Sequence, residues 1–169
     1  QRWLPERGGG PERKIIFNDR EGDRLVSVVM DVESGERRTL PLPISAVSAD
    51  GRRALSVNYA RAGRHRPVIG YPGVADPTEG VALPEDDGVF SIDVETGDVS
   101  LAVSIADAAR AYDGAENIDG REFWLFHTEF NPSASRFMFL LRYNLMKDVF
   151  RTVLFTAGAD GADLRMLAD

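Results

Sequence analysis

The sequence predicts an all-β fold of consecutive four-stranded antiparallel meander blades, a partial β-propeller of about 2.75 blades that we expect to be a fragment. Short runs of alternating apolar and polar residues are separated by turn residues. One hairpin motif occurs three times along the chain, and a second turn motif alternates with it. No segment favours a helix longer than about two turns.

The first hairpin motif is an acidic residue followed by a pair that ends in glycine. Residues 31–36 read DVESGE, residues 93–98 read DVETGD, and residues 156–163 read TAGADGAD as a looser third copy. A Ser/Thr-Gly or Asp-Gly pair suits a tight hairpin with positive φ. Each copy joins two β-rich runs, which are residues 25–32 and 37–42, 89–94 and 99–105, and 152–156 and 164–167.

The second turn motif precedes an apolar strand. Residues 48–53 (SADGRR) lead into residues 54–59, and residues 131–136 (NPSASR) lead into residues 137–141. Together the motifs predict five segments. These are a flexible terminus (1–13), the last three strands of a preceding blade (14–43), a complete blade with a long loop at 60–87 (44–105), a connector with a short helix (106–123) and a complete blade (124–169).

This pattern resembles the TolB-like and WD-repeat-like propeller blades of bacterial proteins, whose first hairpin reads roughly Ser-Pro-Asp-Gly-Ser-Arg. Residues 48–53 have Ala49 in the proline position, whereas residues 131–136 keep Pro132 but replace Asp-Gly by Ser133 and Ala134. A closed propeller typically needs four to eight blades. The resemblance therefore implies that the remaining blades of a parent chain are partners of this one. The alternative is an open β-meander stack that dimerises.

Composition excludes several classes of function. The formal charge of −7 argues against general nucleic-acid binding, which needs a net basic face. The lack of cysteine excludes disulfides, thiolate metal sites and cysteine nucleophiles. No apolar run approaches the roughly 18 residues that cross a bilayer, so we expect no membrane insertion. The sequence predicts a soluble protein and leaves the choice between cytoplasm and periplasm open.

The long loop is the first candidate site. Its basic half carries Arg61, Arg64, His65 and Arg66, and it continues through Tyr71, which is flanked by turn residues, to an acidic half that ends at Asp86 and Asp87. Arginine forks suit carboxylates and phosphates, and a tyrosine ring can stack on a sugar. The alternative is a solvated loop whose basic half pairs with its acidic half. Asp86 and Asp87 could also form an acid–base pair, although adjacent strand residues usually point apart.

The second candidate is His127. Alternation along residues 122–131 places Phe126, Thr128 and Phe130 on one face of a strand and His127 with Glu129 on the other. A histidine on the innermost strand of a blade could act as a metal ligand or general base. The alternative is an ordinary packed or surface histidine. Because His65 is the only other histidine, a metal site would need carboxylates or residues from missing blades.

A more distant resemblance concerns activity. The long loop, the Asp86-Asp87-Gly88 sequence and the His127 strand before Asn131-Pro132 are similar to oligogalacturonate lyases, propeller enzymes that use histidine-bound manganese to cleave acidic oligosaccharides. This resemblance implies a divalent metal with His127 as its ligand. We therefore expect a module that binds a small anionic ligand, such as an acidic sugar, or a protein partner. The alternatives are a metal-assisted lyase or hydrolase on acidic oligosaccharides, and a purely structural repeat array.

Overall fold

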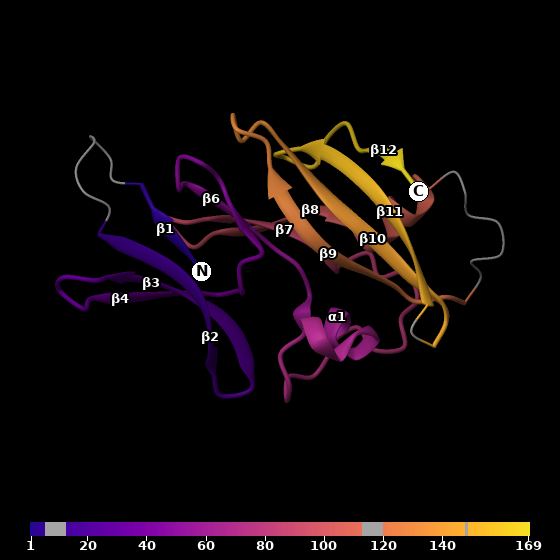
Figure 1. Cartoon of the computed structure of the whole chain (residues 1–169), viewed down its shortest axis with the longest axis horizontal. Helices are drawn as coiled ribbons and strands as arrows, with labels where there is room; N and C mark the ends of the chain where they lie inside the picture. The colour runs from indigo at the N-terminus through magenta and orange to yellow at the C-terminus, as the bar shows by residue number, and fades with distance from the viewer. Residues whose placement is uncertain (6–12, 113–119, 148) are drawn as a thin grey trace.

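A computed structural model describes residues 1–5, 13–112, 120–147 and 149–169. In this part of the chain the strands form three four-stranded sheets, in which every pair of neighbouring strands is antiparallel and consecutive in sequence. The sheets follow one another along the molecule from the N-terminal to the C-terminal end (Figure 1). The all-β fold of consecutive four-stranded meander blades, as in part of a propeller, is therefore confirmed.

The elements are short. The first sheet contains β1 (Arg2–Leu4), β2 (Lys14–Glu21), β3 (Arg24–Asp31) and β4 (Arg37–Leu40). The second contains β5 (Ala46–Val47), β6 (Arg53–Ser56), β7 (Gly88–Asp93) and β8 (Val99–Ser104). The third contains β9 (Phe123–Phe130), β10 (Arg136–Met146), β11 (Val149–Gly158) and β12 (Arg165–Ala168). Three helical turns join them: α1 (Tyr59–His65), the 3-10 turn η1 (Pro67–Ile69) and α2 (Ile105–Arg110).

The N-terminal segment differs from the expectation. Residues 1–13 were expected to be a flexible terminus, but β1 pairs with β2 in the register Leu4↔Lys14. Leu4 is buried against the second sheet, and Arg2 Nη1 donates to the main-chain oxygen of Val47 at 2.9 Å. The first unit therefore has four strands rather than three. The glycine-rich stretch at residues 8–11 lies outside the described residues.

The first hairpin motif folds in the same way at its first two copies. Asp31 Oδ1 accepts hydrogen bonds from the main-chain N–H groups two and three residues later, at 3.0 Å each. Asp93 Oδ1 accepts the corresponding bonds at 2.8 and 2.9 Å. Gly35 and Gly97 follow with φ values of 73° and 83°, which glycine adopts without a Cβ clash. In the third copy, Gly161 has a φ of 85°.

The second turn motif is closed by a polar first residue. Ser48 Oγ accepts from the main-chain N–H of Arg53 at 3.0 Å, and Asn131 Oδ1 accepts from that of Arg136 at 3.1 Å. The missing glycine of the second copy has a visible consequence. Ala134 takes a positive φ of 53°, a conformation that an L-residue adopts only at a cost.

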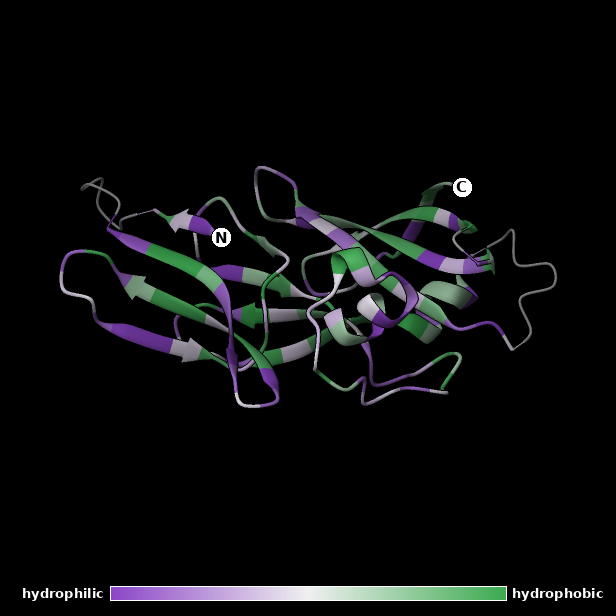
Figure 2. Ribbon diagram, turned by 60° about the horizontal axis from the view of Figure 1, so that its bottom comes forward, coloured by the Kyte–Doolittle hydropathy of each residue, from purple (hydrophilic) through white to green (hydrophobic). Residues whose placement is uncertain are grey.

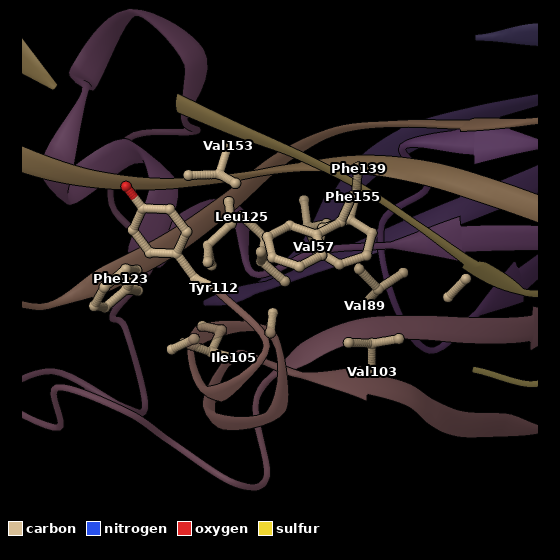
Figure 3. Packing of buried hydrophobic residues seen from close by; sticks show 14 of the residues in the cluster. Val57, Val89, Val103, Ile105, Tyr112, Phe123, Leu125, Phe139, Val153 and Phe155 are labelled. Atoms are coloured by element: carbon tan, nitrogen blue, oxygen red, sulfur yellow. The ribbon is translucent and has the colours of Figure 1, made fainter. Parts of the chain in front are cut away.

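Two apolar cores lie between the sheets. Ile16, Val29 and Leu40 of the first sheet pack with Ala54 and Ile92 of the second. The larger core joins the second and third sheets, where Val57 and Val89 pack with Phe139 and Phe155 (Figure 3). Hydrophobic and hydrophilic residues alternate along the strands, as expected for sheets with different environments on their two faces (Figure 2).

The short helices are positioned by N-caps. The helix expected in the connector is α2, in which Ser104 Oγ accepts from the N–H of Asp107 at 2.9 Å. Helix α1 was not expected, because residues 60–87 were read as loop. It begins where Asn58 Oδ1 accepts from the N–H of Arg61 at 2.9 Å. None of the described helices is long and apolar enough to cross a bilayer.

Candidate functional site

The first half of the long connection folds back on itself through two glycines. Helix α1 and the end of η1 approach so closely that a Cβ on Gly70 would lie 2.3 Å from the Cα of Gly63. No larger residue fits at this contact without moving the backbone. The turn brings Tyr59 and Tyr71 into an edge-to-face contact, with ring centroids 5.3 Å apart. Tyr71 is 40% exposed, and its hydroxyl accepts from Asn18 Nδ2 of the first sheet at 3.1 Å.

Arg61 is fully buried and uses its donors within the chain. Its Nε donates to the main-chain oxygen of Phe123 at 2.6 Å, and Nη1 donates to both oxygens of Thr78 at 3.0 and 3.1 Å. Its Nη2 donates to the oxygens of Val81 and Ala82 at 2.8 and 3.2 Å. These five bonds match the five donors of a guanidinium. Arg61 therefore fastens α1 to the second half of the connection and to β9, which leaves no donor for an external anion.

Arg64 and His65 meet a carboxylate that precedes β9. Arg64 Nη2 lies 2.9 Å from Asp76 Oδ2 and 2.6 Å from Glu122 Oε2, and His65 Nε2 lies 3.1 Å from the same Glu122 oxygen. The basic half of the connection thus pairs partly with its own acidic half. Burial tends to raise the pKa of Glu122, but the bond and charge of Arg64 hold that pKa below its usual range.

His65 is a packed histidine. Its side chain is 10% exposed, its ring stacks parallel to that of Trp124 with centroids 6.1 Å apart, and Asn144 Nδ2 donates to its Nδ1 at 3.2 Å. Burial lowers the pKa of His65, the charge of Arg64 lowers it further, and Glu122 opposes them. The lowered pKa of His65 favours the neutral ring, and Nε2 lies 3.1 Å from Glu122 Oε2 without a hydrogen bond to it.

Arg66 lies on the other side of α1, above the third sheet. Its guanidinium carbon is 5.0 Å from the ring centroid of Phe150, and that of Arg142 on β10 is 4.8 Å from the same centroid. Arg142 also lies over the rings of Trp124 and Phe126, at 5.3 and 5.9 Å. Neither arginine has a carboxylate oxygen within 4.0 Å in the part of the chain that the structure describes. Sequence reasoning missed Arg142, because nothing local distinguishes it from other strand arginines.

A cleft of about 410 Å³ lies between the first two sheets and the long connection. We call it the inter-sheet cleft. Its lining includes Arg24, Asn58, Thr78, Phe90 and the two carboxylates expected from sequence, Asp86 and Asp87. Sequence reasoning missed Asn58 and Thr78. For Asn58 there was a signal, because asparagine is a residue type that favours helix N-caps.

Asp86 and Asp87 differ in burial. Asp86 is exposed, whereas Asp87 is 3% exposed. Asp87 Oδ2 accepts from Asn58 Nδ2 at 2.8 Å and from the Thr78 hydroxyl at 2.9 Å. Burial raises the pKa of Asp87, and these two donors and the charge of Arg61 oppose that rise.

A second hollow of about 320 Å³ adjoins the cleft across residues 74 and 75 and has Arg64 and Tyr71 on its wall.

His127 occupies a β-bulge in β9. Its φ is 61°, and the β9–β10 register shifts between Phe126↔Leu140 and Glu129↔Met138. The side chain of His127 is exposed. The extra residue overturns the expected alternation, because a bulge moves every later side chain to the opposite face.

Contacts on the two sides of the bulge show this change of face. Phe126 lies under Arg142 on the outer face of the third sheet, whereas Phe130 packs against Phe137 in the core. The hydroxyl oxygens of Thr128 and Ser45 lie 2.5 Å apart between the sheets.

The predicted site residues therefore fall into separate groups. Arg64 and Tyr71 share one hollow and Asp86 and Asp87 share the cleft, while His127 is absent from the linings of both. In the described ranges, no three His, Cys, Asp or Glu side chains are grouped so that they could hold a metal ion. The role of His127 as a metal ligand or catalytic base stays a prediction.

Comparison with known proteins gives little further guidance. No family model matches the chain, and no curated protein matches it. Among solved structures, the chain is similar to TolB from Acinetobacter baumannii, with 12% sequence identity and a TM-score of 0.41. The similarity covers 92% of this chain and 41% of the TolB chain. The chain thus spans about two fifths of the length of that protein, and similarity at this level says nothing about function.

Proposed function

We propose that the protein is a small-molecule-binding module and that its ligand occupies the inter-sheet cleft. The volume of about 410 Å³ falls in the range of roughly 300–1,000 Å³ that is usual for ligand pockets. Such pockets combine apolar walls with a few converging polar groups. Here Val57, Phe90 and Pro41 supply apolar wall, and Asn58, Thr78 and Asp87 supply the polar groups.

The observation that carries this proposal is the buried carboxyl group of Asp87. Burying a carboxylate costs free energy unless donors compensate it, so such groups are uncommon outside functional or paired positions. Asp87 has two neutral donors, and no guanidinium or imidazole nitrogen of the described residues lies within 4.0 Å of its oxygens. A perturbed carboxyl in a cleft is a physically motivated candidate for ligand binding.

The charges along the cleft favour a neutral or cationic ligand. Three carboxylates, Asp23, Asp86 and Asp87, line it, against the single guanidinium of Arg24. The anionic sugar expected from the sequence depended on Arg61, Arg64 and Arg66. The guanidinium groups of Arg61 and Arg64 are engaged by the chain itself, and Arg66 lies over Phe150 and does not line the cleft. A neutral sugar or an amino sugar suits the cleft better, because its hydroxyl groups can donate to Asp87 while its ring packs on Phe90.

Ligand-observed NMR with a panel of neutral, amino and uronic-acid sugars tests the proposal. We expect saturation transfer to neutral or amino sugars and none to the uronic acid. Asp87→Asn and Thr78→Val should each weaken binding by about tenfold, the effect of one good hydrogen bond. Glu85→Gln is the matched control, since Glu85 is exposed and does not line the cleft. Preferential binding of the uronic acid, or equal binding by Asp87→Asn, would overturn the assignment.

The lyase or hydrolase alternative is less well supported by the geometry. It needs His127 beside further ligands or a substrate, yet His127 is exposed on the third sheet and does not line the cleft. The partner-binding and structural alternatives concern the outer faces of the first and third sheets.

A further inference from the structure

We propose that the outer face of the third sheet docks on the outer face of the first sheet of a second copy of this chain. Two copies then associate head to tail and contribute six sheets, twice the three of one chain, which lies in the typical range of four to eight blades for a closed propeller. This inference is independent of the ligand proposed for the inter-sheet cleft.

One face of the third sheet is covered by the second sheet, and α1 lies on one end of the other face, where His65 stacks on Trp124 and Arg66 lies over Phe150. Along β10, Phe137, Phe139 and Leu141 are buried in the core shared with the second sheet. The alternate residues Met138 and Leu140 are only half-buried, although their neighbours on this face are also apolar. Those neighbours are Phe126 and Leu154, which pair with Leu140, and Phe150.

The opposite side of the first sheet carries half-buried and exposed apolar residues around two buried valines, Val26 and Val28. Ile16 and Val29 point into the core shared with the second sheet, so Ile15, Phe17 and Met30 lie on the outer face. Trp3 pairs with Ile15 on this face and is 51% exposed. Contiguous apolar surface of this kind is uncommon on monomers and usually marks an interaction site.

The packing of the second sheet on the third provides a template for this contact. Arg53, Arg136 and Lys14 each begin the second strand of their sheet. Val57 is the fourth residue after Arg53, as Leu140 is the fourth after Arg136. Leu141 and Tyr143 are the fifth and seventh residues after Arg136, as Asp19 and Glu21 are after Lys14.

In the observed contact Val57 belongs to the same core as Leu141 and Tyr143. The same stacking between two copies brings the face of β10 that carries Leu140 and Arg142 against the face of β2 that carries Asp19 and Glu21.

The charges at these positions are complementary. Arg142 is half-buried among aromatic rings, and in the described part of the chain no carboxylate lies within 4.0 Å of it. Burial and the charge of Arg66 both lower the pKa of Arg142, so a carboxylate at this position would relieve an uncompensated charge. Asp19 and Glu21 are exposed on the outer face of the first sheet, which is the face that would meet Arg142.

Sedimentation equilibrium of the full chain at tens of micromolar tests the proposal. The wild type should have twice the 18.6 kDa mass of one chain. Arg142→Glu should be monomeric, as should the double variant Asp19→Arg/Glu21→Arg, because each places like charges across the contact. Arg52→Glu is the matched control and should stay dimeric, since Arg52 lies in the β5–β6 turn, away from both end faces.

Mixing the two variants distinguishes a lost contact from a lost fold. Each variant carries the charge that the other one needs, so an equimolar mixture should recover the dimer mass. Circular dichroism of each variant alone checks that its strands are intact. A monomeric wild type, which would leave these faces to further blades of a longer chain, overturns the proposal. A mixture of folded variants that stays monomeric also overturns it.

Discussion

Arg61 and Phe123 are separated by 62 residues, yet the guanidinium Nε of Arg61 donates to the main-chain oxygen of Phe123 at 2.6 Å. Through this bond the helix that opens the long connection is fixed to the start of the third sheet. The remaining donors of the same guanidinium hold residues 78, 81 and 82 in place. A basic residue that the sequence predicts to be a ligand-binding group thus organises the wall behind the inter-sheet cleft.

Removal of this guanidinium should be costly. Arg61→Leu leaves the oxygens of Phe123, Thr78 and Val81 without their donor, and unsatisfied buried acceptors cost roughly 1–3 kcal/mol each. We expect the free energy of unfolding, measured by urea denaturation, to fall by at least about 3 kcal/mol. Arg110→Leu is the control, because Arg110 is 59% exposed and its two ion pairs lie at the surface. That change should cost far less than the loss of Arg61, because surface ion pairs contribute little to stability. Equal losses in the two variants would contradict a structural role for Arg61.

Two glycines with similar backbone conformations should respond differently to alanine. Gly35 has a φ of 73°, and a Cβ there would meet nothing within 4 Å, whereas a Cβ on Gly161, at 85°, would lie 1.8 Å from the main-chain oxygen of Ala102. Gly35→Ala should cost about 1–2 kcal/mol for the left-handed conformation alone. Gly161→Ala should cost about 2–5 kcal/mol, because the hairpin must also move away from β8. Thermal unfolding of both variants measures the difference, and equal melting temperatures would show that the hairpin yields freely.

The hairpins could be predicted because their chemistry is local. Asp31 and Gly35 form their turn with residues at most a few positions away, and the same holds for Asp93 and Gly97. Strand β1 could not be recognised in this way, because its three residues are stabilised by partners on β2 and by Val47.

The candidate site was less predictable, because its residues act across long separations. Helix α1 has only seven residues with Gly63 among them, so its sequence is a weak helix signal. It depends on the contact with Gly70 and on the buried bonds of Arg61. Proximity of Arg61 and Arg64 to other basic residues suggested an anion site, but their partners are distant acceptors that no local pattern reveals. The bulge at His127 likewise reversed an alternation that was correct up to that residue.

The strained backbone of His127 gives a prediction that separates structure from function. A residue with a Cβ pays roughly 1 kcal/mol or more for the left-handed conformation, and a β-branched residue pays most. In urea denaturation, His127→Gly should therefore be more stable than the wild type by a few tenths to about 1 kcal/mol. His127→Val should be less stable than the wild type. If glycine instead destabilises the protein, the exposed imidazole makes a contact that outweighs the backbone strain.

The neutral, packed state of His65 predicts how stability depends on pH. Because folding lowers the pKa of His65 from its usual 6.5, the unfolded chain binds the extra proton more readily as the pH falls below about 6.5. The free energy of unfolding should therefore decrease between pH 7.5 and pH 5.5, by at most about 1.4 kcal/mol per pH unit for one proton.

Guanidinium denaturation of the wild type and of His65→Gln over this range measures that dependence. The glutamine cannot take up a proton, so His65→Gln should lose most of the slope. Glu122 and Arg64 remain charged throughout the range, because the pKa of Glu122 is lowered and that of Arg64 is raised. A slope that survives in His65→Gln would mean that another group takes up the proton, and that the stacking of His65 on Trp124 does not depend on its neutral form.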